Sequence, residues 1–175
     1  MGRLLQVLLE LARSDNDRLQ LVMQHHDPED ALLIAYERLR SLAVDRLQLA
    51  MPSTSVLPSI EVDQDRLQQC LASLVDNALI YAEGSIQLSA ECIGSHVVLH
   101  VQDDGPGIPA AERDKVMQRF QRGTTATGTR GSGLGLALVQ QLVALMNGEL
   151  RIADAAGGGA DLQLWFRASG LQPGP

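Results

Sequence analysis

Two glycine-rich turns in the C-terminal half of the chain are the features best suited to chemistry. The first, residues 103–108 (Asp-Asp-Gly-Pro-Gly-Ile), closes an alternating strand pattern, and the second, residues 131–136 (Gly-Ser-Gly-Leu-Gly-Leu), opens a long apolar helix. Backbone N–H groups at a helix start attract anions. The segment between the turns is aperiodic and carries arginines. Together these features predict a nucleotide pocket with a mobile lid.

Asp103 is the first candidate contact to a base. It falls on the same strand face as the alternating apolar residues of 97–101, at the mouth of the predicted core. A carboxylate there is costly unless it accepts hydrogen bonds, and an adenine amino group is a natural donor. Gly105 and Gly107 would let the backbone approach a flat ring closely. Taken alone, the segment is better explained as an ordinary turn.

The second turn differs from two known phosphate-binding motifs. No Gly-Lys-Ser/Thr follows, so it is not a P-loop, and its spacing is not that of the dinucleotide fingerprint. A plain flexible linker fits poorly, because the turn runs straight into an apolar helix. An anion site at the helix start is the better interpretation.

Other polar residues extend this prediction. Asn77 lies at the rim of the apolar stripe on a predicted helix, where its neutral amide oxygen could coordinate Mg²⁺. Arg119 and Arg122, in or beside the aperiodic stretch, carry guanidinium groups that suit phosphate oxygens. A structural amide and solvated surface charges remain open alternatives for these residues.

The remaining periodicity predicts the elements that position these residues. Alternating patterns predict strands at 19–23, 47–51, 86–92, 97–101, 149–154 and 160–167, and residues 52–59 read as a loop. Helical patterns cover 3–13, 27–43, 63–82, 110–119 and 134–146. Short alternating strands favour a mixed, mostly antiparallel sheet with helices on one face, an α+β two-layer sandwich. A parallel doubly wound sheet is disfavoured, because it would need continuous apolar strands, which the sequence lacks.

Composition excludes several classes of protein. The chain has 175 residues and a net charge of −7, which argues against nucleic-acid binding. Cys70 and Cys92 both fall at positions predicted to be buried, which suggests reduced core cysteines. No run of about 18 apolar residues and no signal peptide is evident. We expect a cytoplasmic location; a longer parent protein anchored in the bacterial inner membrane stays open.

Four short motifs, in this order and spacing, resemble those of sensor histidine kinases. They are Asp76-Asn77-Ala78, the turn at 103–108, residues 119–122 (Arg-Phe-Gln-Arg) and the turn at 131–136. The resemblance covers residues 18–168 as the catalytic ATP-binding domain of the GHKL type, with the Bergerat fold. Residues 1–14 resemble the end of a dimerisation helix, and residues 169–175 are expected to be a loose tail.

The resemblance implies a role for each candidate residue. Asn77 would bind Mg²⁺, Asp103 would read the adenine amino group, and Arg119 and Arg122 would reach the phosphates. The remaining implied nucleotide contacts are Tyr81, Gly105, Gly107, Ile108, Gly131, Gly133, Leu134, Gly135 and Leu136. The implied reaction moves the γ-phosphoryl group of ATP to a histidine on a dimerisation helix, for relay to a response regulator. A homodimer of the parent protein is also implied.

Three departures from the family pattern weaken parts of this expectation. Ser73 stands where related proteins have Asn or a catalytic Glu, which disfavours hydrolysis by an activated water. Ile80 replaces a basic residue, so we expect weaker nucleotide affinity. Met117 replaces an aromatic residue, but it can still fill an apolar gap.

The phosphate acceptor is not evident in the sequence. The segment that would carry it in the family would lie before Met1, and His25, His26, His96 and His100 read as structural or solvated. This chain alone is therefore not expected to phosphorylate itself. Two alternatives stay open: a degenerate domain that only docks partners, and a serine kinase of the anti-sigma-factor type. The leucine-rich segment 3–13 argues against the second.

Overall fold

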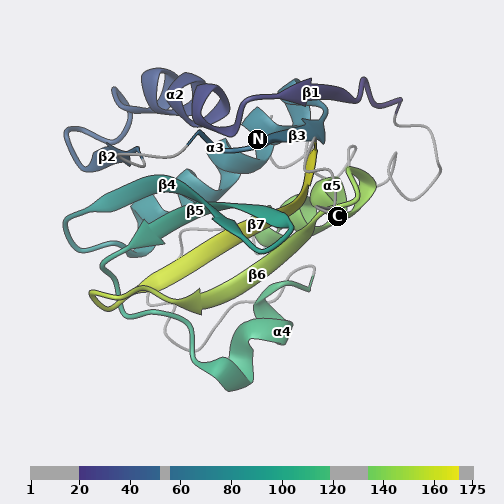
Figure 1. The fold of residues 1–175 in the computed structure, drawn as a ribbon. Helices are drawn as coiled ribbons and strands as arrows, with labels where there is room; N and C mark the ends of the chain where they lie inside the picture. Colours follow the sequence, from purple (N-terminus) through teal and green to yellow (C-terminus); the bar gives the residue numbers. More distant parts are fainter. Residues whose placement is uncertain (1–19, 52–55, 119–133, 170–175) are drawn as a thin grey trace.

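The computed structural model describes residues 20–51, 56–118 and 134–169 (Figure 1). Its strands are β1 Gln24–His26, β2 Leu47–Ala50, β3 Ser59–Val62, β4 Ile86–Ile93, β5 His96–Asp103, β6 Glu149–Asp154 and β7 Ala160–Ser169. Its helices are α2 Pro28–Leu39, α3 Gln64–Tyr81, α4 Arg113–Val116 and α5 Gly135–Leu145, with a 3-10 turn at Ala110–Glu112.

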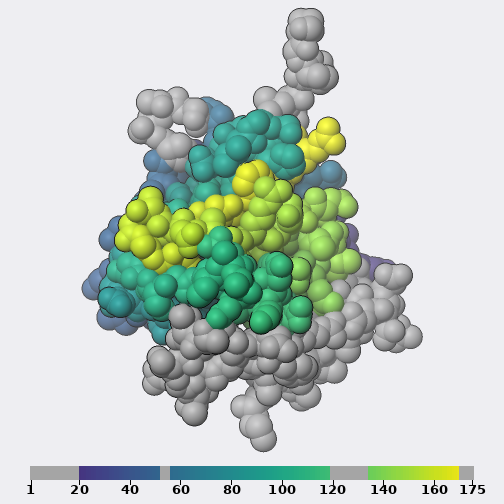
Figure 2. Space-filling view, turned by 90° about the horizontal axis from the view of Figure 1, so that it is seen from below, coloured from purple at the N-terminus to yellow at the C-terminus, as the bar shows by residue number. Residues whose placement is uncertain are grey.

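The strands form one mixed sheet. Its order is β1-β3-β7-β5-β4-β2, and β6 also pairs with β7. Only β2 and β4 pair in parallel among the described strands; the other pairs are antiparallel. The predicted mixed and mostly antiparallel sheet is therefore confirmed. Figure 2 shows α4, in green, beside the yellow-green to yellow chain of β6 and β7.

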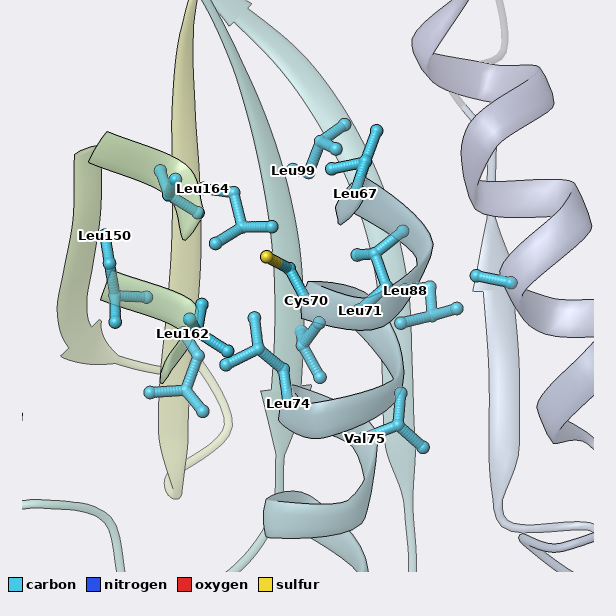
Figure 3. Close-up of a cluster of buried hydrophobic side chains, with 14 of the residues drawn as sticks. Leu67, Cys70, Leu71, Leu74, Val75, Leu88, Leu99, Leu150, Leu162 and Leu164 are labelled. Atoms are coloured by element: carbon cyan, nitrogen blue, oxygen red, sulfur yellow. The ribbon is translucent and has the colours of Figure 1, made fainter. Parts of the chain in front are cut away.

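The core lies between the sheet and the long helices. Leu67, Leu71 and Leu74 recur on one face of α3, and all three are fully buried. They lie against inward-facing strand residues such as Leu99 and Leu164 (Figure 3). This helical spacing of leucines opposite alternating strand residues is the pattern that a two-layer sandwich requires.

Aspartate caps fix the starts of two of the predicted helices. Asp27 directly precedes Pro28, the first residue of α2, and its carboxylate accepts the backbone N–H of Glu29 at 2.8 Å. The Asp63 carboxylate accepts the N–H of Arg66 at 3.1 Å and also that of Val22 at 2.8 Å. The second bond joins the start of α3 to the chain that leads into β1.

Some boundaries were predicted wrongly. No strand was predicted after the loop 52–59, but residues 59–62 form β3. This strand pairs with β1 and β7, and no local pattern in the sequence reveals that pairing. The first strand lies at 24–26, after Leu21 and Met23 rather than on them. Helix α2 ends at Leu39, because the chain turns there and reaches left-handed backbone at Val44 and Asp45.

The two cysteines differ. Cys70 is buried in α3, and this burial raises the pKa of its thiol well above the usual range. Cys92 is exposed, so its prediction as a core residue is wrong. It shares the strand face of Ala90 and lies opposite Val97, but it is near the β4–β5 turn, where the last three residues of β4 are exposed.

Several predictions fall outside the described residues. These are the helix at 3–13, the end of the dimerisation helix at 1–14, the lid residues Arg119 and Arg122, the glycines Gly131 and Gly133, and the tail after Ser169. Across the three described ranges, no helix is both long and apolar enough to span a lipid bilayer.

Candidate nucleotide-binding site

Asp103 ends β5 as a buried carboxylate with an incomplete set of partners. Its side chain is on the core face and the residue is only 6% exposed. Oδ1 accepts the backbone N–H of Gly105 at 2.9 Å and that of Ala160 at 3.2 Å, whereas Oδ2 accepts no hydrogen bond from the described residues. Burial raises the pKa of Asp103, although the two N–H donors oppose the shift. Oδ2 is thus placed to accept a donor from a ligand.

Asp104, the next residue, has the opposite environment. Its carboxylate accepts the backbone N–H groups of Glu83, Gly84 and Ser85, each at 2.9 Å. These bonds, led by the one from Gly84, lower the pKa of Asp104. Asp104 therefore ties the end of α3 to the end of β5. Sequence reasoning assigned Asp104 no separate role.

Three glycines bring the backbone segments of this site into direct contact. A Cβ on Gly105 would overlap the carbonyl of Tyr81 at the end of α3. Gly107 has a φ of +72°, and a Cβ there would lie 3.1 Å from the carbonyl oxygen of Gly159. Gly159 itself has a φ of +86° and packs on the carbonyl of Asp103. The β6–β7 turn is therefore part of the site, which no sequence pattern indicated.

Helix α3 connects this end of the site to the start of α5. Ser73, Asn77 and Tyr81 recur every fourth residue, so they lie in one row along about 12 Å of the helix. Tyr81 touches Gly105 through its carbonyl, and the Ser73 hydroxyl oxygen lies 3.1 Å from where a Cβ on Gly135 would sit. Asn77 lies between these two contacts, is half-buried, and its side chain makes no hydrogen bond within the described residues.

The start of α5 offers backbone groups rather than side chains. Leu134 is fully buried and Leu136 is 9% exposed, so both side chains belong to the core. The first backbone N–H groups of a helix have no partner within it. Any ligand contact from Leu134, Gly135 or Leu136 would therefore come from these N–H groups. Ile108 is partly buried against the core, and Ile80 is 42% exposed.

Comparison with known proteins agrees with this geometry. The family model described as histidine kinase-, DNA gyrase B-, and HSP90-like ATPase matches residues 62–170. The chain belongs to this ATPase family.

Its relatives and structural neighbours include several sensor kinases. It is 33% identical to the sensor protein CreC of Escherichia coli over 91% of this chain and 34% of CreC. It is 36% identical to the histidine-protein kinase/phosphatase MprB of Mycobacterium leprae over 86% of this chain and 29% of that protein. It thus spans about a third of the length of these relatives.

Solved structures give the same result. Full-length ShkA, crystallised with AMPPNP, superimposes with a TM-score of 0.78 at 30% identity, over 94% of this chain and 35% of ShkA. The ATP-binding domain of PrrB from Mycobacterium tuberculosis gives 0.67 at 25% identity, over 83% of this chain and 97% of that one. In sequence and fold the chain therefore resembles the ATP-binding domains of sensor histidine kinases, as its motifs predicted. The roles of individual site residues stay predictions.

Proposed function

We propose that this domain binds ATP with Mg²⁺ and transfers the γ-phosphoryl group to a histidine on a dimerisation helix. That helix is supplied by an upstream region of the parent protein or in trans. The phosphoryl group is then relayed to the receiver domain of a response regulator. Because ATP is the substrate, we place the domain in the cytoplasm, whether or not the parent protein is anchored in a membrane.

The environment of Asp103 is the observation that carries this proposal. Two backbone N–H groups hold Oδ1 in place, and the uncompensated Oδ2 can accept the adenine amino group. A carboxylate acceptor without a partner among the described residues favours a ligand that supplies the donor. The backbone of Gly105 and Gly107, together with Tyr81 and Ile108, would enclose the ring.

The phosphates would lie toward Asn77 and the start of α5. The Asn77 oxygen is a hard, neutral ligand that fits Mg²⁺, and the described residues hold no group of three His, Cys, Asp or Glu side chains that could bind a metal by themselves. Phosphate oxygens and water would therefore complete the coordination shell. Bound Mg²⁺ would supply charge neutralisation for the phosphates. Arg119 and Arg122 would contact the phosphates from the lid.

The proposed chemistry is an in-line displacement. The lone pair of the acceptor imidazole forms a bond to the γ-phosphorus while the bond to the bridging oxygen breaks and ADP leaves. The phosphorylated imidazolium then loses the N–H proton of its other ring nitrogen to water. The domain contributes by positioning the triphosphate and stabilising its charge, since no covalent step needs a protein nucleophile on this chain.

A calorimetric titration with AMPPNP and Mg²⁺ tests the binding site. The wild-type domain should bind saturably, and Asp103→Asn should weaken binding about a hundredfold, because an amide N–H would face the adenine amino group. Asp114→Asn, on exposed α4, is the matched control and should bind normally. Absence of saturable binding by the wild type, or normal binding by Asp103→Asn, would contradict the proposal.

Phosphotransfer needs a separate experiment. A second polypeptide, consisting of a dimerisation helix with the acceptor histidine, is mixed with this domain and labelled ATP, and acid-labile phosphohistidine is measured. Transfer should occur with the wild type and fail in Asn77→Ala. Binding of ATP without any transfer would favour the alternative of a domain that only docks partners.

A further inference from the structure

Arg113 joins two backbone segments of the site without lying in any of the recognised motifs. It opens the short helix α4, and its side chain is 22% exposed. Its Nε donates to the carbonyl oxygen of Ile108 at 3.1 Å, and its Nη2 donates to Oδ1 of Asp154 at 2.6 Å. Ile108 ends the first glycine-rich turn, and Asp154 is the last residue of β6.

The two joined segments, the glycine-rich turn and the β6–β7 turn, both lie beside Asp103. On one side, Gly107 packs against Gly159, so the glycine-rich turn and the β6–β7 turn already touch. On the other side, the Ala160 N–H at the start of β7 holds Oδ1 of Asp103. Arg113 adds a third link between the same two turns, because it bonds both Ile108 and Asp154. Figure 2 shows α4 beside β6 and β7, as this link requires.

The ion pair between Arg113 and Asp154 does not by itself indicate a function. Asp154 is 76% exposed, and pairs of this kind contribute little stability. The carbonyl of Ile108 changes the interpretation, because it lies in a stretch with no helix or strand to satisfy it and backbone carbonyls need donors. A planar guanidinium can serve the carbonyl and the carboxylate at once, whereas an ammonium group acts as a point charge.

We infer that Arg113 is a positioning residue for nucleotide binding, which holds the Gly107–Ile108 backbone against the β6–β7 turn so that the base-binding end is formed before the ligand arrives. This inference rests on the proposed function of the site. Arg113 acts through the Ile108 carbonyl and does not touch the nucleotide.

Three variants and a control separate this role from simple charge or stability. Arg113→Ala should weaken binding of Mg²⁺-AMPPNP about tenfold, as expected for one lost hydrogen bond that orders a loop. Arg113→Lys keeps the charge but loses the planar fork, so it should weaken binding nearly as much. Asp154→Asn keeps the contact to Ile108 and should have a smaller effect. Lys115→Ala, exposed on the same helix, should bind normally.

The rate of phosphotransfer distinguishes positioning from a general structural defect. At saturating ATP, Arg113→Lys should transfer phosphate at the wild-type rate, so that its KM rises while kcat stays the same. If Arg113→Ala does not fold, the lysine variant and Asp154→Asn still decide the question. Wild-type affinity in Arg113→Lys, or a fall in kcat with no change in KM, would overturn the inference. Failure of the wild type to bind nucleotide would instead overturn the proposed function.

Discussion

The two faces of the β5–β7 strand pair each bury a carboxylate, but they treat it differently. On the core face, Asp103 is 6% exposed and its Oδ2 lacks a partner among the described residues. On the outer face, Asp161 is 4% exposed and lies 3.0 Å from Nδ1 of His100. The Asp161 carboxylate also accepts the Gln163 amide at 2.7 Å, and Glu91 lies 3.2 Å from Nε2 of His100.

Opposite pKa shifts express this difference. Burial raises the pKa of Asp103, because its hydrogen bonds do not compensate the lost hydration. Burial alone would also raise the pKa of Asp161, but the hydrogen bonds from His100 and Gln163 and the charge of His100 lower it. A buried acid that is short of partners is a candidate binding site, whereas one with a complete set of partners is structural. Substitutions on both faces test this contrast between Asp103 and Asp161.

Substitutions at the contact between the β6–β7 turn and Asp103 should lower the free energy of unfolding the most. Gly159→Ala places a Cβ onto the Asp103 carbonyl and strains a backbone at φ +86°, so we expect a loss of about 4 kcal/mol in the free energy of unfolding. Gly158→Ala has the positive φ of +92° but open space, and should lose about 1 kcal/mol. Gly157→Ala, with neither feature, should change stability by less than about 0.5 kcal/mol.

Urea unfolding of the three glycine variants measures this series. Equal stability of Gly159→Ala and Gly158→Ala would mean that the close contact with Asp103 does not exist in solution. Nucleotide binding by Gly159→Ala, measured where it remains folded, should also be reduced, because the Ala160 N–H that holds Asp103 would be displaced.

The outer-face cluster should contribute to stability but not to nucleotide recognition. Asp161→Asn removes the charge that faces His100 inside the protein, and we expect a loss of about 2–3 kcal/mol in stability. Glu91→Gln is the matched control, because the Glu91 side chain is 57% exposed and should contribute less than about 1 kcal/mol. AMPPNP affinity should be unchanged in both variants while they are folded. A large loss of affinity in Asp161→Asn at full stability would contradict the contrast between the two faces.

The outer-face cluster should also make stability depend on pH. Burial alone lowers the pKa of His100, but the hydrogen bond and charge of Asp161, together with Glu91, raise it above its ordinary value of 6.5. The protonated imidazole is thus favoured by folding, and its contribution is fully present below pH 6.5 and lost as pH rises through the folded-state pKa. The stability difference between the wild type and His100→Gln should shrink by roughly 1 kcal/mol over that range.

Unfolding curves of both proteins between mildly acidic and alkaline pH measure this shrinkage. His25, His26 and His96 are present in both proteins, so their titration cancels in the difference. A difference that grows with pH would show that His100 is neutral in the folded protein.

Local patterns predicted much of the fold, and long-range register explains most of what they missed. The leucine spacing of α3, the β4–β5 hairpin and the inward position of Asp103 all follow from periodicity within one element. Strand β3 and the His100–Asp161 pair instead depend on partners far along the chain. Arg113 lies in the helix predicted at 110–119, but a local helical pattern does not connect it to Ile108 or Asp154.

Loss of the Asp103 charge should change stability in the opposite direction to the other substitutions. A carboxylic acid whose folded-state pKa is raised is destabilised in its ionised form, so Asp103 opposes folding at neutral pH. Asp103→Asn removes the buried charge while its amide oxygen can still accept the N–H groups of Gly105 and Ala160. We expect stability equal to the wild type or higher by up to about 1 kcal/mol, together with the roughly hundredfold weaker AMPPNP binding.

Thermal and urea unfolding at pH 7 without nucleotide measure this effect. The advantage of Asp103→Asn should vanish as pH falls through the raised pKa of Asp103, because the wild-type side chain then becomes neutral as well. Asp161→Asn should be destabilised under the same conditions, since its carboxylate has a lowered pKa and its charge supports folding. A marked destabilisation by Asp103→Asn would mean that the carboxylate is held for the fold rather than kept available for a ligand.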